Sequence, residues 1–432
     1  MKSHISKLIL IIVSSTFLYS VGICQNAPEK VAGIPVNYDE SKTGTYSLPD
    51  PLVLLNGEKV DNQKTWYNKR RPEIVRLFED NQFGRCPDRS NISFNLFDHG
   101  TLAFNDKAIR KQVTIYFTDD TSNYKADLLI YLPAESKEPV PLFFNISFVP
   151  NSLVVDDPGV KKGMMWSREG NKVPASEGRR FGLLDVEKFI SEGFGVATIY
   201  YGDIEPDFAK GIKNGIRGHY LKDGMNYPAP DEWGAISAWA WGLSCAMDYL
   251  ETDNQIDSKK VALFGVSRLG KTVLWAGAAD QRFGMVIASC SGEGGAALSR
   301  RNYGETIKHM TDSSRYFYQF CGNRAKYGDD PSQSPVDSHM LISLIAPRPL
   351  LLQTGDTDNW SDPKGEFLAA VAAEPVYQLL GKKGLETDVM PAAGTPILND
   401  IGYYMHSGGH GSLPDDSDIF LKFMKMHFSE KK

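Results

Sequence analysis

The sequence predicts an α/β protein, a three-layer sandwich in which a mostly parallel sheet carries helices on both faces. Three observations lead to this fold class. Apolar, strand-like segments alternate with helical patterns over roughly 230 residues, as in a chain of βαβ units. Shorter alternating segments before them are typical of an antiparallel edge. A buried strand, a tight turn and a helix also follow one another within residues 261–277.

The region before the sheet is predicted to be an arm followed by a helix. Residues 26–65 are punctuated by proline and glycine and are expected to be extended. Residues 65–81 predict an amphipathic helix, because Ile74, Leu77 and Phe78 fall on one face. Three strands of an antiparallel edge follow, at 93–97, 112–117 and 126–132.

The next elements are two buried strands, each followed by a polar stretch. The strands are expected at 141–147 and 195–201, where apolar residues run together. The polar stretches at 150–182 and 203–231 predict insertions near the site. A long helix with three tryptophans is expected over 233–250.

The stretch at 261–277 carries the first functional signal. An apolar strand leads into a glycine-flanked turn, 265–270, that contains Ser267, and a helix is expected over 271–277. This is the layout of the nucleophile elbow of α/β-hydrolases, in which the turn lifts a serine hydroxyl off the sheet. The second glycine, Gly270, stands three residues after the serine rather than the usual two. A Gly-Ser turn in any doubly wound sheet is the alternative explanation.

Two cations follow the serine in the first helical turn. Arg268 and Lys271 lie where the helix macrodipole is positive, which costs stability unless something compensates. A compensating negative charge arises there if an oxyanion forms during a reaction. The alternative is that these side chains reach solvent or pair with a structural carboxylate. For Arg268, this carboxylate could come from the segment 203–231.

The segments after the elbow supply the remaining strands and two loops. Strands are expected at 285–289 and 350–354. The first runs into the glycine-rich turn 291–295, and the second into the carboxylate-dense loop 355–362. A last helix is predicted over about 416–428.

A serine hydroxyl becomes a good nucleophile only when a base takes its proton and a carboxylate orients that base. In α/β-hydrolases these groups follow in the order serine, acid, histidine. The sequence offers Ser267 first and His410 last, the histidine in a glycine loop before the final helix. His406, nearer to a strand-like segment, is the second candidate for the base. The possible acids between them are Asp356, Asp358 and Asp362. The other mature histidines, which are expected to be structural, are His99, His219, His309, His339 and His427.

Composition limits the partners of the protein. The net charge of −6 and the pI near 5.8 argue against nucleic acid or an acidic membrane surface. No internal repeat appears, which excludes solenoids and arrays. Residues 25–432 are therefore predicted to form a single catalytic domain with insertions.

The N-terminus predicts export. Lys2 and Lys7 precede an apolar run that is too short to span a bilayer, so residues 1–24 are predicted to be a signal peptide. The mature protein would then be secreted or periplasmic. Cys24 is an alternative site for a lipid, but Ile23 before it fits that processing poorly.

Four cysteines remain after cleavage, and an exported protein permits one or two disulfides among them. They are Cys86, Cys245, Cys290 and Cys321. The sequence does not pair them, although Cys245 falls in a helical apolar pattern and is expected to be buried. No metal site is expected, because only His406 and His410 are spaced like helical ligands and they lie in a glycine loop. We also expect no cofactor and a monomer.

Several runs of residues share a pattern with one known family. The most specific is Gly-Val-Ser-Arg-Leu-Gly-Lys at 265–271, which also accounts for the displaced glycine. The other runs lie at 70–74, 233–242, 291–306 and 358–363. Together they resemble the bacterial glucuronoyl esterases, which form carbohydrate esterase family fifteen. The resemblance covers nearly the whole mature chain.

The resemblance implies cleavage of the ester between 4-O-methyl-glucuronic acid on glucuronoxylan and a lignin alcohol. By motif position it implies that Ser267 is the nucleophile, His410 the base and Arg268 the stabiliser of the oxyanion. The residues that it implies for contact with the uronate ring are Lys271, Glu305 and Trp360. A tryptophan, a lysine and a carboxylate suit a sugar rich in hydroxyl groups.

The acid of the triad departs from the commonest pattern of that family. Many members carry a catalytic glutamate directly before the Ser-Gly of the glycine-rich turn, and here that position is Cys290. Some bacterial members use instead an aspartate two residues before the tryptophan, which is Asp358. We therefore predict Asp358 as the acid and keep Glu293, in the same turn as Cys290, as the alternative. Asp356 and Asp362 are expected to cap loops.

Two other functions remain open at this point. One is an acetyl or other carbohydrate esterase on the same scaffold, which would show little preference for uronate esters. The other is a glycan-binding protein that has lost catalysis with the missing glutamate, which would bind xylan fragments without hydrolysing any ester.

Overall fold

The computed structural model describes residues 29–89, 91–167, 169–175 and 182–429. The predicted signal peptide, with Cys24, and part of the predicted 150–182 insertion therefore lie outside the described residues. Within the described ranges, no helix has both the length and the apolar character needed to cross a membrane.

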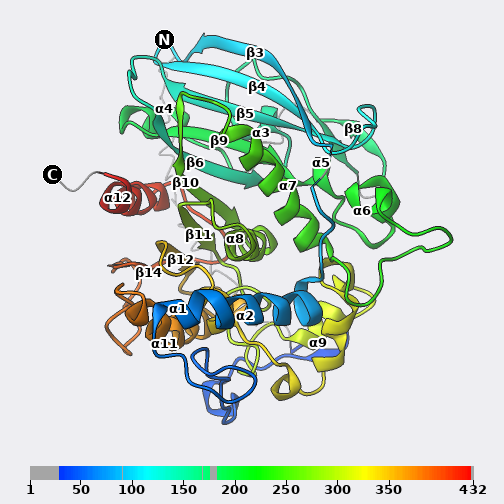
Figure 1. Cartoon of the computed structure of the whole chain (residues 1–432), viewed down its shortest axis with the longest axis vertical. Coiled ribbons are helices and arrows are strands. Elements are labelled where there is room, and N and C mark those ends of the chain that lie inside the picture. Colours follow the sequence, from blue (N-terminus) through cyan, green and yellow to red (C-terminus); the bar gives the residue numbers. More distant parts are fainter. Residues whose placement is uncertain (1–28, 90, 168, 176–181, 430–432) are drawn as a thin grey trace, which may run out of the picture.

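A ten-stranded sheet forms the centre of the molecule, in the order β13-β14-β12-β11-β10-β6-β9-β5-β4-β3 (Figure 1). The strands from β14 to β9 pair in parallel, whereas β13 and the β5-β4-β3 edge pair antiparallel. This confirms the predicted mixture of a parallel core and an antiparallel edge. The strands are β3 (Ser93–Ala103), β4 (Ala108–Tyr116), β5 (Lys125–Pro133), β6 (Val140–Ser147), β9 (Gly195–Tyr200), β10 (Ile256–Val266), β11 (Met285–Ser289), β12 (Leu350–Gly355), β13 (Ile397–Leu398) and β14 (Ile401–His406).

Helices cover both faces of the sheet, as the fold class predicts (Figure 1). Side chains alternate along each strand, so Leu263 of β10 packs into one core and its neighbours Ala262 and Phe264 into the other. The first core includes residues of α2 (Arg71–Phe78), α7 (Ala235–Leu250), α8 (Arg268–Ala279), α10 (Ser338–Ser343) and α11 (Pro363–Leu379). The second core includes residues of α3 (Asn151–Val154), α4 (Val186–Ser191) and α12 (Asp416–Phe428).

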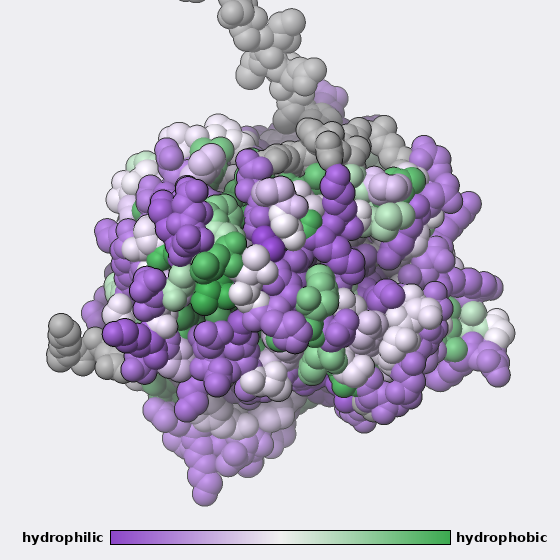
Figure 2. Space-filling model, turned by 90° about the horizontal axis from the view of Figure 1, so that it is seen from above, coloured by the Kyte–Doolittle hydropathy of each residue, from purple (hydrophilic) through white to green (hydrophobic). Residues whose placement is uncertain are grey.

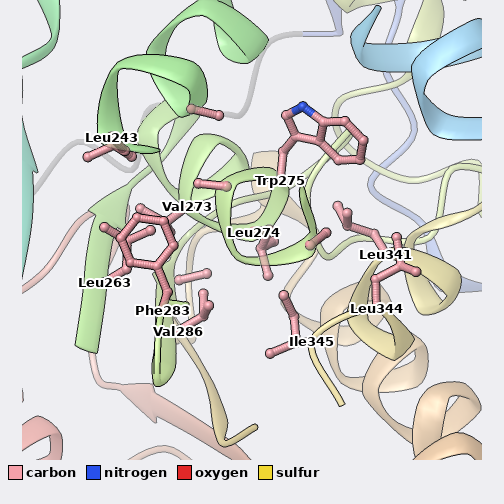
Figure 3. Packing of buried hydrophobic residues seen from close by; sticks show 14 of the residues in the cluster. Leu243, Leu263, Val273, Leu274, Trp275, Phe283, Val286, Leu341, Leu344 and Ile345 are labelled. Carbon is pink, nitrogen blue, oxygen red and sulfur yellow. The ribbon is translucent and has the colours of Figure 1, made fainter. Parts of the chain in front are cut away.

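The helix that follows the elbow lies in the middle of the larger core. α8 packs against α7 and α10, and its residues Val273, Leu274 and Trp275 meet side chains from both helices and from the sheet (Figure 3). These three residues are almost fully buried. This packing fixes the position of α8, and therefore also of its first turn, where the candidate catalytic residues lie.

The remaining strands and α-helices are short. They are β1 (Lys30–Val31), β2 (Ile34–Pro35), α1 (Gln63–Thr65), β7 (Met164–Trp166), β8 (Lys172–Pro174), α5 (Tyr201–Ile204), α6 (Ile216–His219) and α9 (Ile307–Thr311). The face seen from the β3 side is mostly hydrophilic, with hydrophobic residues in small separate groups (Figure 2).

Among the predicted boundaries that differ from the structure, those of two helices matter most. α8 begins at Arg268 and not at Lys271, because Ser267 alone makes the turn between strand and helix. The helix predicted over 65–81 is longer and interrupted, since α1 and α2 are joined by the wider turns of a π-helix at Trp66–Arg70. Ile74 and Phe78 of that helix are buried, as predicted, whereas Leu77 is only half-buried.

Candidate active site

The candidate catalytic residues lie at the carboxyl ends of four neighbouring strands. Ser267 directly follows β10, Cys290 directly follows β11, Asp358 comes three residues after β12, and His410 four residues after β14. These strands are adjacent and parallel in the order β14-β12-β11-β10. Ligands of open α/β sheets bind at this edge. The topology thus brings together residues that are far apart in the sequence.

The backbone at Ser267 has the strained conformation of a nucleophile elbow. Its φ of 61° and ψ of −126° lie in a region that non-glycine residues rarely adopt. The amide N–H of Ser267 donates to the carbonyl oxygen of Ser289 at 2.8 Å, which ties the turn to the end of β11. A sharp turn held in this way presents the serine side chain at the edge of the sheet.

The glycine at the third position after the serine has a packing reason. A Cβ atom added to Gly270 would lie 2.7 Å from the carbonyl oxygen of Ser289 and 3.1 Å from the Cβ of Ser291. The residue at the usual second position, Leu269, is instead fully buried in the core. Gly270 therefore lets α8 approach β11 and the glycine-rich turn closely.

Replacement of this glycine is expected to destabilise the fold. Gly270→Ala forces a backbone shift at the elbow, and such overpacking costs about 1–3 kcal/mol. Thermal unfolding would show the loss as a lower Tm. Gly409→Ala is the matched control, because a Cβ there meets nothing within 4 Å. Equal melting temperatures of the Gly270→Ala variant and the unmodified protein would contradict this explanation.

His410 and Asp358 form a direct pair. Nδ1 of His410 lies 2.7 Å from Oδ2 of Asp358 and 3.2 Å from Oγ of Ser361. The Asp358 side chain is only 4% exposed, whereas that of His410 is 43% exposed. Burial acts to raise the pKa of Asp358, but hydrogen bonds from His410, Ser361 and Cys290, with the charge of His410, outweigh it and lower this pKa. The acid is thus held ionised beside an accessible imidazole.

Backbone contacts lock the acid loop to the histidine loop. Oδ1 of Asp356 accepts from the N–H of Gly408 at 2.8 Å, and the N–H of Thr357 donates to the carbonyl oxygen of Gly408 at 3.0 Å. A Cβ at Gly355 would lie 2.1 Å from the carbonyl oxygen of Gly409, so only glycine permits this approach. The geometry of the His–Asp pair therefore depends on main-chain contacts. Asp362 is the other acid of this loop. Its Oδ1 caps α11 by accepting a hydrogen bond from the N–H of Gly365 at 2.9 Å.

His406, the second candidate base, is buried at the end of β14. Its Nδ1 lies 2.9 Å from Oδ2 of Asp416, and its Nε2 lies 3.0 Å from the carbonyl oxygen of Gly409. Both ring nitrogens are thus engaged within the protein. His406 joins the histidine loop to the start of α12 and has no free nitrogen for a substrate.

Cys290 lies against the His–Asp pair. Its sulfur, a carboxylate oxygen of Asp358 and a ring nitrogen of His410 all lie within 4.8 Å of one another. Burial and then the charge of Asp358 raise the pKa of the Cys290 thiol to about 12. A thiol with this pKa stays protonated at neutral pH and donates a hydrogen bond to Asp358.

The alternative acid, Glu293, is engaged elsewhere. Its Oε1 accepts a hydrogen bond from the guanidinium of Arg324 and one from Oγ of Ser299 at 3.2 Å. The side chain is 2% exposed, and burial raises its pKa despite these partners. The structure thus brings Asp358, and not Glu293, to Nδ1 of His410.

Arg268 is held by a carboxylate of the 203–231 segment, the partner that the sequence offered as the structural alternative for this side chain. Its guanidinium pairs with Asp207 and lies over the ring of Tyr316, 5.0 Å from the ring centroid. Burial acts to lower the pKa of Arg268, but Asp207 and nearby tyrosines outweigh it and raise this pKa. Asp207 also accepts from the hydroxyl of Tyr318 at 2.9 Å and from Nε2 of Gln319 at 2.8 Å. The guanidinium is therefore fixed in one orientation beside Ser267.

The three residues expected to contact a sugar also form one cluster. Nζ of Lys271 lies 3.7 Å from Oε2 of Glu305 and donates to the carbonyl oxygen of Ser291 at 2.7 Å. Nε1 of Trp360 donates to Oε1 of Glu305 at 3.1 Å. Arg315, which no sequence pattern identified, lies 5.2 Å from the ring centroid of Trp360 and 3.3 Å from Glu305. The cluster joins an aromatic face to alternating positive and negative groups.

None of the four cysteines within the described residues forms a disulfide, although the sequence permitted one or two. Cys245 is buried in α7, as predicted.

Comparison with known proteins identifies relatives over most of the chain. The family model "Glucuronyl esterase, fungi" matches residues 188–381. A carbohydrate esterase of an unknown prokaryotic organism is 44% identical over 401 residues, which are 91% of this chain and 92% of that protein. A 4-O-methyl-glucuronoyl methylesterase of Phanerochaete carnosa is 26% identical over 357 residues, 81% of this chain and 74% of that protein.

A solved structure shows the same arrangement of the chain. The glucuronoyl esterase from Solibacter usitatus superposes with a TM-score of 0.86 at 44% sequence identity. The match covers 90% of this chain and 100% of that one. Both the sequence and the fold are thus shared over nearly the entire catalytic region.

Proposed function

This chain belongs to the glucuronoyl esterases of carbohydrate esterase family fifteen, and we propose that it cleaves the ester between 4-O-methyl-glucuronic acid of glucuronoxylan and a lignin alcohol. The observation that carries the proposal is the position of the Lys271–Glu305–Trp360 cluster. Lys271 stands one helical turn after Ser267, so a sugar held by the cluster has its carboxyl carbon beside the serine.

The first step is acylation of Ser267. Nε2 of His410 takes the proton of the serine hydroxyl, and Oγ of Ser267 attacks the ester carbonyl. Oδ2 of Asp358 accepts a hydrogen bond from Nδ1–H of His410, which keeps Nε2 free as the base and stabilises the imidazolium that forms. His410 then gives the proton to the alcohol as it leaves. In deacylation, His410 takes a proton from water as the water oxygen attacks the acyl carbon, and it then gives this proton to Oγ of Ser267 as the serine leaves.

The charge that develops on the carbonyl oxygen is met at the start of α8. The esterified carboxyl is neutral in the bound substrate, so negative charge appears only when Oγ of Ser267 adds to it. The guanidinium and backbone N–H of Arg268, together with the helix N-terminus, act on this charge. Asp207 holds the guanidinium without cancelling this role, since its carboxylate also accepts from Tyr318 and Gln319.

Trp360 is expected to act on the sugar and not on the ester. Trp360→Ala removes the aromatic face and the donor to Glu305, so KM for uronate esters should rise by the equivalent of about 1–3 kcal/mol. Turnover of simple aryl acetates should hardly change. Trp360→Phe, which keeps a ring but loses the Nε1 donor, separates the two contributions. Equal losses on aryl acetates and uronate esters would mean that Trp360 only supports its loop.

The proposed function also includes the organisation of the chain and its export. Residues 25–432 act as one catalytic domain, with no metal or cofactor required for the steps above and with a monomer as the working unit. Residues 1–24 are a signal peptide that directs the enzyme to the periplasm or the medium, where lignin-carbohydrate esters are accessible.

Kinetics on paired substrates test the proposed function. Purified enzyme is assayed on benzyl glucuronate and on an aryl acetate, with Ser267→Ala as the control for background hydrolysis. The proposal predicts a much higher kcat/KM for the uronate ester. Comparable values for the two substrates, with turnover of acetylated xylan, would identify a general carbohydrate esterase. Xylan-fragment binding without hydrolysis of any ester would identify a binding protein.

A further inference from the structure

The His–Asp pair and the neighbouring thiol bring three metal-ligand types together. Sγ of Cys290, a carboxylate oxygen of Asp358 and a ring nitrogen of His410 lie within 4.8 Å of one another. We propose that these three side chains bind a thiophilic divalent cation, such as Zn²⁺ or Cd²⁺, and that this binding inhibits the enzyme. No metal site was expected from the sequence, because only His406 and His410 are spaced like helical ligands. The three ligands proposed here come from three separate loops, so no spacing in the sequence reveals them.

The donor set suits zinc better than the common hard cations. Zinc is bound by thiolate, imidazole and carboxylate at about 2.0–2.3 Å, so its donors stand about 3–4 Å apart. The present donors need to move by only about 1 Å or less to reach those distances. Mg²⁺ and Ca²⁺ prefer oxygen ligands and bind thiolates poorly. Three protein ligands leave a fourth position for water, as in zinc sites that are open on one side.

Neighbouring hydrogen bonds orient the three ligands, and an exposed side leaves the site accessible to a cation from solvent. The N–H of Gly411 donates to Sγ of Cys290 at 3.3 Å, a contact that also stabilises a thiolate. Oγ of Ser361 lies 3.2 Å from Nδ1 of His410 and hydrogen bonds Asp358 as well. Cys290 and Asp358 are buried, but the 43% exposed side chain of His410 opens the site to solvent.

Binding at Nδ1 reverses the tautomer of the catalytic histidine. The cation takes the place of the Nδ1 proton and of the Cys290 thiol proton; the imidazole takes up one proton at Nε2, so one proton in all goes to solvent. The imidazole of His410 is then neutral with its only N–H proton on Nε2, the nitrogen that must accept the proton of Ser267. The carboxylate of Asp358 is occupied as well. A loaded site therefore has no base, and inhibition follows from the proposed triad.

Binding and inhibition are measured separately. Metal-free enzyme is titrated with CdCl₂ while the ultraviolet absorption of the Cd²⁺–thiolate bond is recorded, and with ZnCl₂ while ester hydrolysis is followed. We expect one thiolate-bound Cd²⁺ per chain and loss of most of the activity with Zn²⁺ that EDTA restores. MgCl₂ and CaCl₂ should have no effect. The absorption measurement does not depend on the proposed function, so it remains decisive even if no ester is hydrolysed.

Variants assign the site. Cys290→Ala should abolish the Cd²⁺ absorption and raise the inhibitory Zn²⁺ concentration by about tenfold or more. Cys321→Ala, which removes another buried free thiol, should leave both unchanged. Cys290→Ser replaces the alanine variant if the latter fails to fold. Retention of the Cd²⁺ absorption in the Cys290 variants, or binding at Cys290 without loss of activity, would overturn the proposal.

Discussion

Asp358→Asn is expected to lower kcat by on the order of 10³ while the protein remains folded. The amide keeps the shape of the carboxylate, but it neither stabilises an imidazolium nor fixes the tautomer of His410. Because Oδ2 of Asp358 lies 2.7 Å from Nδ1 of His410, no other orienting group needs to be invoked. Steady-state kinetics on benzyl glucuronate give kcat, and circular dichroism with a melting curve shows that the fold persists.

Glu293→Gln is the matched control for this variant. Glu293 is buried in a pair with Arg324, so the neutral amide should lower Tm and leave kcat of the folded fraction nearly unchanged. The opposite pattern, near-full activity of Asp358→Asn with loss of activity in Glu293→Gln, would place the acid in the glycine-rich turn and refute the assignment of Asp358.

Arg268→Ala is expected to reduce kcat by about 10²–10³ with little change in KM. The guanidinium interacts with charge that exists only in the transition state, which is the condition for an effect on kcat. The backbone N–H of residue 268 survives the substitution, so some oxyanion stabilisation remains. Arg268→Lys keeps the charge but loses the fork that pairs with Asp207, and it should recover only part of the loss.

Substitution of the partner of Arg268 distinguishes catalysis from support. Asp207→Asn retains hydrogen bonds to Tyr318 and Gln319 but weakens the hold on the guanidinium, so it should lower kcat by less than Arg268→Ala. Unchanged kcat in Arg268→Ala together with a clear drop in Tm would show that the Arg268–Asp207 pair is a structural tie only.

Local patterns predicted most of the fold. The last helix was expected over about 416–428 and is observed at Asp416–Phe428, because its apolar face repeats with helical spacing. The strand before Ser267 was predicted from an apolar run, and the structure extends it to Ile256–Val266. The start of α8 was predicted three residues too late. A single residue, Ser267, makes the turn between strand and helix for which a longer segment was expected. Pattern alone does not reveal a positive φ at a residue other than glycine.

The candidate site was predictable where motif and chain order coincide. Ser267, Asp358 and His410 follow the hydrolase order, and the structure places the last two in contact. Asp207 was anticipated only as an unnamed carboxylate of 203–231, and Arg315 was missed, because their roles arise from contacts between segments separated in the sequence. Arg268 and Asp207 are 61 positions apart, and no periodicity links them. The pairing of such residues is a property of the tertiary fold.

The neighbouring ends of β11 and β12 offer two places from which a side chain can reach the catalytic histidine. Adjacent strands are about 4.8 Å apart, so a side chain after either strand reaches the same imidazole. Cys290 and Asp358 stand at those two ends, and both approach His410. A carboxylate after either strand could therefore orient the same imidazole, so the two strand ends are alternative positions for the acid of one triad.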